Sequence, residues 1–334
     1  MSKDTLVLVH TIFRHGERTP DRDHQYARDP YIKEEYTPFG PGRLTNVGKR
    51  SMFDLGKVLR DIYNEYLGDL YIPKYVDAFT TDYDRTKASL QLVLASLYPP
   101  KNENVWHDEL NWQPIPYNSS PAKYDSILGG IVEKPGFLAA YTENFENGEG
   151  RKLFEKHHEV IEYLQKHTGN DIKHTRHVWF LLGTLVTQKQ FGLTLPDWTA
   201  PVFPNVLAEL CSHEYKMQTA TKELKRLVVG KLMEKILKDT KAKISGKSEC
   251  KIHLYSAHDC SIAHFLIFFR VMYRHFPSYA SCAVLEIHLL NGKHVLKLKY
   301  RESKTAEFEY LSFPNGSETL TLEDFEGMVT DLLN

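Results

Sequence analysis

The stretch that decides the fold is residues 5–20, TLVLVHTIFRHGERTP, in which an apolar run ends at a histidine between two arginines. The apolar run is rich in β-branched residues, which predicts a buried strand. Arg14, His15 and Arg18 follow at the point where this strand ends, and Gly16 would let the backbone approach a ligand closely. Arginine offers a rigid fork of donors that matches phosphate, and histidine can attack phosphorus and carry the phosphoryl group. The stretch therefore predicts a phosphate site with His15 as its nucleophile.

The rest of the chain alternates strands and helices at both ends around a helical middle. We expect strands over 6–13, 75–80 and 252–256, helices over 44–67, 85–98 and 261–275, a hairpin of 283–289 with 295–300, and a closing helix over 323–333. This order predicts an α/β fold with a doubly wound, mostly parallel sheet flanked by helices, and a helical cap insertion. The predicted domains are a discontinuous α/β domain, residues 1–134 and 241–334, and a cap domain, residues 135–240.

The composition is that of an ordinary soluble globular protein. Of the 334 residues, 42% are hydrophobic and 25% are charged, and the chain exceeds the length at which one core stops growing. The 42 basic and 43 acidic residues give a net charge of −1. This balance predicts no nucleic-acid partner and no membrane partner, and no apolar run is long enough to span a bilayer. A homodimer is compatible with the sequence.

Two further strand-to-helix junctions carry residues suited to phosphate chemistry. Arg85 begins a helix, where its charge is unfavourable with the helix dipole unless an anion lies nearby. That anion is either a bound phosphate or a neighbouring carboxylate, Asp82 or Asp84. His258 and Asp259 follow the third expected strand, and Asp259 could instead serve only as a helix cap.

In open α/β sheets, ligands bind outside the carboxyl ends of the strands. We therefore expect the three junctions to meet in one site. Its candidate residues are Arg14, His15, Arg18, Arg85, His258 and Asp259. No metal site and no cofactor is predicted, because the remaining histidine groups, His157 with His158 and His174 with His177, lack thiolates or carboxylates at metal-binding spacing.

Further short stretches carry a family resemblance. They are RLT (43–45), DRT (84–86), WQPIP (112–116), LTLPDW (193–198) and YASC (279–282). With the two histidine motifs, they make the chain resemble the histidine acid phosphatases from about residue 5 to residue 330. This branch of the histidine phosphatase superfamily includes prostatic, lysosomal and insect venom acid phosphatases. Residues 90–100, LQLVLASLYPP, look most like the insect venom and salivary members.

The resemblance implies a mechanism and a compartment. His15 would form a phosphohistidine, and Asp259 would protonate the leaving alcohol and then activate water. Phosphate oxygens would be held by Arg14, Arg18, Arg85 and His258. The substrate would be a small-molecule phosphate monoester, with no metal required. The family members that the chain most resembles are secreted, so we expect secretion, although no signal peptide precedes the first strand.

The cysteines depart from the family pattern. Cys211, Cys250, Cys260 and Cys282 allow three pairings or none, and the usual family partner of Cys282 is absent. The loss of the usual disulfides suggests a diverged lineage with relaxed demands on catalysis.

This divergence leaves a second function open, a catalytically weak or inactive secreted protein of saliva or venom. Such a protein would bind a small bioactive ligand, for example a biogenic amine or an eicosanoid. Its apolar pocket would be lined by Trp179, Phe180, Trp198, Tyr117 and Tyr124. We favour the enzyme, because the chain retains both His15 and Asp259.

Overall fold

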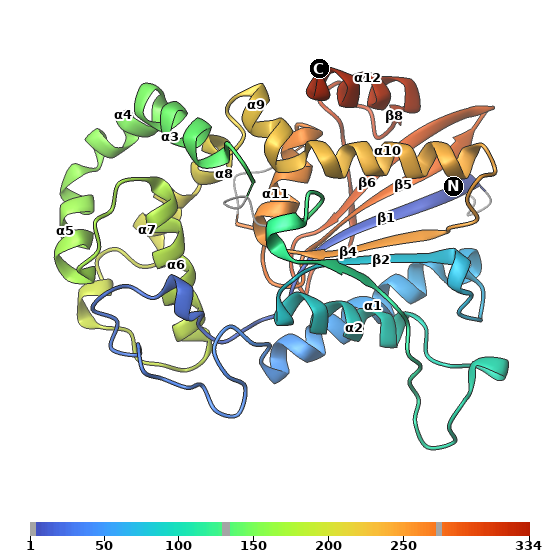
Figure 1. Ribbon diagram of the computed structural model, residues 1–334, viewed down its shortest axis with the longest axis horizontal. Helices are drawn as coiled ribbons and strands as arrows, with labels where there is room; N and C mark the ends of the chain where they lie inside the picture. The colour runs from blue at the N-terminus through green and yellow to red at the C-terminus, as the bar shows by residue number, and fades with distance from the viewer. Residues whose placement is uncertain (1–4, 129–133, 272–275) are drawn as a thin grey trace.

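The strands of the described residues form one eight-stranded sheet at the centre of the protein. The structure is a computed structural model that describes residues 5–128, 134–271 and 276–334 (Figure 1). Its strands are β1 (Leu6–Arg14), β2 (Val76–Thr81), β3 (Asn118–Ser120), β4 (Ile252–Ala257), β5 (Cys282–Leu290), β6 (Lys293–Arg301), β7 (Glu309–Leu311) and β8 (Leu320–Thr321). The spatial order is β3-β2-β4-β1-β5-β6-β7, and β8 also pairs with β6.

The sheet is parallel on one side of β1 and antiparallel on the other. Strands β3, β2, β4 and β1 pair in parallel, whereas β5 runs antiparallel to β1 and the remaining pairs are antiparallel. The α/β class is thus confirmed, with the refinement that the sheet is mixed. The pairing of β5 with β6 has a local cause: the two strands are joined by the two-residue turn Asn291-Gly292, and both residues have positive φ, 50° and 77°. Such a turn imposes antiparallel pairing, and the predicted hairpin is confirmed.

Helices cover both faces of the sheet and explain why β1 is apolar on both sides. Leu8 and Ile12 pack with α10 (Lys231–Ile244), α11 (Asp259–Phe268) and α12 (Leu322–Leu333). Val9 and Phe13 pack on the other face with α1 (Asn46–Leu67) and α2 (Asp84–Leu97). A strand buried on both faces reads as a continuous apolar run, which is the pattern that predicted it.

The helix predicted over 261–275 is shorter than expected. Helix α11 ends at Phe268, and Arg270 has a positive φ of 59°, which takes the chain out of helical geometry. Residues 272–275 of that prediction lie outside the described residues. The apolar residues beyond Phe268 extended the predicted helix, because they pack beside the helix without being part of it: Phe269 stacks on Phe325 of α12, with ring centroids 5.8 Å apart.

The middle of the chain forms a group of helices beside the sheet, on the left in Figure 1. They are α3 (Phe137–Asn147), α4 (Glu149–Lys156), α5 (His158–Thr168), α6 (Thr175–Gln190), α7 (Asn205–Cys211), α8 (Glu214–Met217) and α9 (Lys222–Lys225). Helices α5, α6 and α7 share a separate core, to which Tyr26 from the loop after β1 contributes. Helix α10 packs instead on the sheet through Met233 and Ile236. The division into two domains at 134 and 240 stays a prediction.

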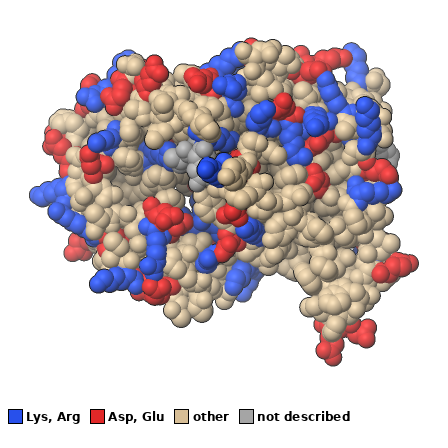
Figure 2. Space-filling view, viewed as in Figure 1, with Lys and Arg blue, Asp and Glu red and all other residues tan. Residues whose placement is uncertain are grey.

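The surface and the cysteines complete the description. Basic and acidic side chains are interspersed over the face seen in Figure 2, as the balanced composition suggests. All four cysteines are free thiols, and only Cys260 is partly exposed. Within the described part of the chain, no helix combines the length and apolar character needed to cross a bilayer.

Candidate active site

The three predicted junctions meet at one edge of the sheet. Arg14 at the end of β1 is in register with Ala257 at the end of β4, and Thr80 of β2 is in register with Ser256 of β4. Because these strands are parallel, the chain leaves all of them at the same edge. All six candidate residues line one cavity of about 420 Å³ there. The structure therefore brings together every residue that the sequence singled out for the site.

His15 is held with one ring nitrogen free to react. The ring is buried, with 3% of the residue exposed, and the backbone amide donates to the carbonyl of Ala257 at 3.0 Å. Nδ1 lies 2.8 Å from the carbonyl oxygen of Gly16. A carbonyl can only accept, so Nδ1 carries the proton and Nε2 keeps its lone pair. Burial and the nearby charges of Arg85 and Arg14 lower the pKa of His15 well below its usual 6.5.

Three buried guanidinium groups surround this histidine. Arg14, Arg18 and Arg85 are 7%, 7% and 8% exposed. Among the described residues, the Nε atom of each of them is buried without a hydrogen-bond partner. Buried donors are rarely left unsatisfied, so three such donors in one cavity point to an anion that binds between them.

Aromatic rings hold two of these arginines in place. The guanidinium carbon of Arg14 lies 4.1 Å from the ring centre of Tyr279 and 5.1 Å from that of Phe276. The corresponding distance from Arg85 to Tyr83 is 4.5 Å. Planar guanidinium groups stack on aromatic faces, which limits their rotation and keeps their donors aimed at one point.

The carboxylate beside Arg85 is one that the sequence analysis missed. Arg85 Nη1 lies 3.1 Å from Oδ2 of Asp21, in the loop after β1. The two expected partners are engaged elsewhere, Asp82 with Lys87 and Asp84 with Arg43. The alternative that Arg85 pairs with Asp82 or Asp84 is therefore wrong. The sequence signal for Asp21 was its position directly after the histidine motif.

His258 and Asp259 occupy the start of α11. Nε2 of His258 lies 3.1 Å from the hydroxyl of Thr81, and its ring packs edge-on against His15 with centroids 5.5 Å apart. Burial and the positive charge of Arg85 lower the pKa of His258 well below 6.5. Oδ1 of Asp259 accepts an amide hydrogen bond from Cys260 at 2.8 Å, and Oδ2 lies 3.3 Å from the guanidinium of Arg14. A cap alone thus does not account for Asp259, because its second oxygen faces the arginine.

Gly16 of the histidine motif has a packing role. A Cβ atom at Gly16 would lie 2.5 Å from the carbonyl oxygen of Gly48, and one at Gly48 would lie 2.0 Å from that of Glu17. The loop after β1 therefore packs directly on the backbone of α1. The close approach expected between Gly16 and a ligand is instead a close approach to this helix.

The five aromatic residues of the alternative function do not line one pocket, so that prediction is wrong. Trp179 and Phe180 line the cavity that contains His15. Trp198 packs in the core of the helical group, Tyr117 packs against the core beneath α2, and Tyr124 is exposed. The prediction failed because it grouped residues by type, whereas they lie on separate elements.

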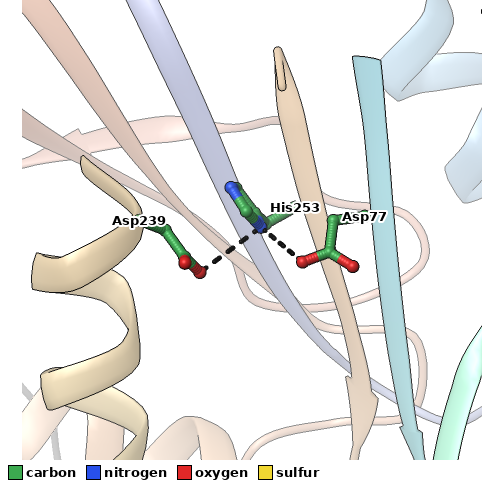
Figure 3. A group of neighbouring side chains, drawn as sticks. All are labelled: Asp77, Asp239 and His253. Carbon is green, nitrogen blue, oxygen red and sulfur yellow. Dashed lines mark hydrogen bonds and ion pairs between the residues drawn. The ribbon is translucent and has the colours of Figure 1, made fainter. Parts of the chain in front are cut away.

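One group of potential metal ligands occurs among the residues that the structure describes. Asp77, Asp239 and His253 place their ligand atoms within 4.8 Å of one another (Figure 3). The ammonium of Lys235 lies 3.4 Å from Asp77 and 2.7 Å from Asp239, where a cation would bind. His253 lies 3.2 Å from Asp77. We therefore interpret the group as an ion-pair cluster that ties α10 to β2 and β4.

Comparisons with known proteins identify the relatives of this chain. The sequence profile of the histidine phosphatase superfamily (branch 2) matches residues 5–126. Venom acid phosphatase Acph-1 of Apis mellifera is 35% identical, over 94% of this chain and 82% of its own length. Human prostatic acid phosphatase is 30% identical, over 97% of this chain and 84% of its own length.

A solved structure shares the fold at much lower identity. The phytase of Klebsiella sp. ASR1 superimposes with a TM-score of 0.69 at 15% identity, covering 99% of this chain and 95% of its own. The sequence relatives match over nearly the whole chain, including the strands, the site loops and the helical group. The chain belongs to the histidine phosphatase superfamily, branch 2.

Proposed function

We propose that this protein hydrolyses phosphate monoesters as an acid phosphatase, with His15 as the nucleophile. The observation that carries the proposal is the free Nε2 of a neutral His15 among three guanidinium groups with unpartnered Nε donors. The relatives named as acid phosphatases support the same activity. No observation favours the alternative of a non-enzymatic binder.

In the first step, Nε2 of His15 attacks phosphorus while the bond to the ester oxygen breaks. Charge on the phosphoryl oxygens is balanced by Arg14, Arg18 and Arg85. These side chains are already in place, so the transition state requires little reorganisation of the site. Asp259, as the acid, gives its proton to the departing alkoxide. The products of this step are the free alcohol and a phosphohistidine.

In the second step, Asp259 acts as a carboxylate and takes a proton from water. The resulting hydroxide attacks phosphorus, the P–N bond breaks, and inorganic phosphate leaves with His15 neutral again. The lowered pKa of His15 suits this role, because the imidazole stays unprotonated and nucleophilic in mildly acidic solution. No step requires a metal, since the arginines supply the positive charge.

The direct test is hydrolysis of an aryl phosphate by the purified protein at about pH 5. We expect turnover that follows saturation kinetics and is inhibited by vanadate, which resembles five-coordinate phosphorus. Absence of turnover, with tight binding of an amine or an eicosanoid instead, would favour the binder.

We also propose that the protein is secreted. The support is the similarity to a relative named as a venom enzyme. Immunoblots of secretory fluid and of washed tissue from the source animal would test this, and protein confined to the tissue fraction would contradict it.

A further inference from the structure

The active-site cavity extends well beyond the phosphate-binding residues, along one face of α6. Its wall there is formed by Trp179, Gly183, Val186 and Gln190 of this helix, together with Phe276. The four helical residues are spaced i, i+4, i+7 and i+11, so they lie on one side of α6. Each is partly or fully exposed, whereas most of the residues between them are buried, among them Leu181, Thr184, Leu185 and Thr187.

This apolar wall begins directly beside the phosphate-binding residues. Phe276 lies 5.1 Å from the guanidinium carbon of Arg14, and its ring centre is 6.3 Å from that of Trp179. Trp179 is fixed in turn by its indole nitrogen, which donates to the hydroxyl of Tyr215 at 3.4 Å. The rings of Phe276 and Trp179 are therefore close enough to contact an alcohol group whose phosphate is bound at Arg14.

The charged groups on the remaining wall do not favour a second phosphate. Besides the predicted catalytic residues, the described lining of the cavity holds one further arginine, Arg176, and two carboxylates, Asp21 and Asp23. His24 also lies there, and burial lowers its pKa to about 4, so it is neutral in mildly acidic solution. Arg176 stacks on Phe180, with its guanidinium carbon 5.1 Å from the ring centre. The wall therefore offers apolar surface rather than an excess of positive charge.

Gly183 is the residue of this wall that packing does not explain. It lies in the middle of α6, where glycine destabilises a helix relative to alanine. Its φ is not positive, and a Cβ atom there would meet no atom of the described residues within 4 Å. No close backbone approach and no turn requires glycine at this position, and the open space beside it is the cavity.

We propose that Gly183 and the apolar face of α6 around it bind the alcohol part of the substrate, and that the preferred substrates are monoesters of alcohols with an aromatic or similarly bulky apolar group. The proposal rests on the proposed function for its phosphate end. A cavity of about 420 Å³ has room for a phosphate and one such group. Gly183 sets the width of the cavity, because any side chain there would fill part of it.

The test compares two esters of primary alcohols, ethyl phosphate and phenethyl phosphate, whose leaving groups have similar basicity. We expect wild-type kcat/KM to be higher for phenethyl phosphate by about tenfold or more, because its phenyl ring is transferred from water to an apolar surface. In Gly183→Leu this preference should fall by about tenfold. Equal kcat/KM for both esters in the wild type, or an equal loss for both in the variant, would overturn the proposal.

A matched control is available on another helix. Gly327 of α12 is also a helical glycine at which a Cβ atom would meet no atom within 4 Å, and it lies outside the cavity. Gly327→Leu should leave the preference between the two esters within about twofold of wild type. If Gly183→Leu does not fold, Gly183→Ala should lower the preference in the same direction by a smaller factor.

Binding of phosphonates separates this proposal from the proposed function. Ethylphosphonate and phenethylphosphonate cannot be hydrolysed. Calorimetric titration therefore measures the affinity of the apolar wall for the phenyl ring whether or not the protein turns over esters. We expect phenethylphosphonate to bind about tenfold more tightly, with the difference reduced in Gly183→Leu. Equal affinities would refute the apolar wall. Absence of turnover with unequal affinities would refute only the proposed function.

Discussion

Arg14 and Asp259 form a nearly buried ion pair across the active site, with Nη2 3.3 Å from Oδ2 and side chains 9% and 8% exposed. The pair joins the end of β1 to the start of α11. Arg14 therefore has two functions in the proposed mechanism, to bind phosphate and to position the acid. Lysine lacks the planar fork needed for both contacts, so Arg14→Lys should not be a conservative change.

The first prediction concerns Asp259 as the acid. Asp259→Asn should reduce turnover of alkyl phosphates by about 10²–10⁴-fold, because an alkoxide needs a proton to leave. Nitrophenyl phosphate should be affected much less, since a nitrophenolate leaves without one. The measurement is kcat/KM for both esters, which reports formation of the phosphohistidine and not its hydrolysis, a step that both esters share and in which Asp259 also acts. Asp108→Asn, in an exposed loop, is the control. Equal losses for both esters would mean that Asp259 only supports the structure.

The second prediction concerns the effect of Arg85 on His15. After burial, Arg85 is the largest cause of the lowered pKa of His15. Removing its positive charge in Arg85→Gln should raise that pKa toward 6.5. The acid limb of kcat/KM should then move to higher pH, because neutral His15 is required for attack. Arg85→Lys keeps the charge and should keep the limb close to its wild-type position.

The wild type and both Arg85 variants act on the same substrate, so ionisation of the substrate does not affect the comparison of their pH profiles. An acid limb at the same pH in the glutamine variant and in the wild type would show that His15 does not control it.

The third prediction is a loss of stability in acid. Burial lowers the pKa of His24 to about 4 and that of His264 to about 3, from 6.5 in the unfolded chain. Below pH 6.5 these two histidines therefore bind more protons in the unfolded chain than in the folded one. Their contribution to the free energy of unfolding is complete above pH 6.5 and is lost as the pH falls. Thermal unfolding should occur at lower temperature at about pH 4 than at about pH 7.

His264→Gln tests the origin of this loss. It should make the dependence of Tm on pH shallower, whereas His107→Gln, in an exposed loop, should not. A Tm that rises on acidification would contradict the prediction.

The fourth prediction concerns metals. EDTA should leave turnover unchanged, because the arginines supply the positive charge at the site. Asp77→Asn, in the ion-pair cluster with Lys235, should also remain active. Loss of activity in EDTA with recovery on addition of zinc or magnesium would contradict the metal-free mechanism.

The location of the site could be predicted from the sequence, because that location depends on local features of the chain. The apolar sequence of β1 predicts a strand that is buried on both faces. Neighbouring parallel strands have their carboxyl ends at the same edge of the sheet, which places the site there. The dipole argument for Arg85 also indicated correctly that an anion is needed nearby. It could not identify Asp21, because that contact depends on the path of the loop after β1 rather than on spacing within α2.

The parts that sequence analysis missed depend on tertiary packing. Phe276 and Tyr279 stack on Arg14 from a distant segment near the other end of the chain, and no periodic pattern relates them. The end of α11 is set by the positive φ of Arg270, whereas the apolar sequence continues past it. The change from parallel to antiparallel pairing occurs between β1 and β5, which are far apart in the sequence, so no local signal predicts it. The Asn291-Gly292 turn predicts only the β5–β6 pair.

The most direct test of the proposed mechanism is to trap the phosphorylated intermediate. Protein mixed with labelled substrate and quenched within one turnover should carry a label that is acid-labile and base-stable, located on His15. His15→Ala should show neither label nor turnover, while His107→Ala should keep both. A label on serine, or full turnover in His15→Ala, would contradict the assignment of His15 as the nucleophile.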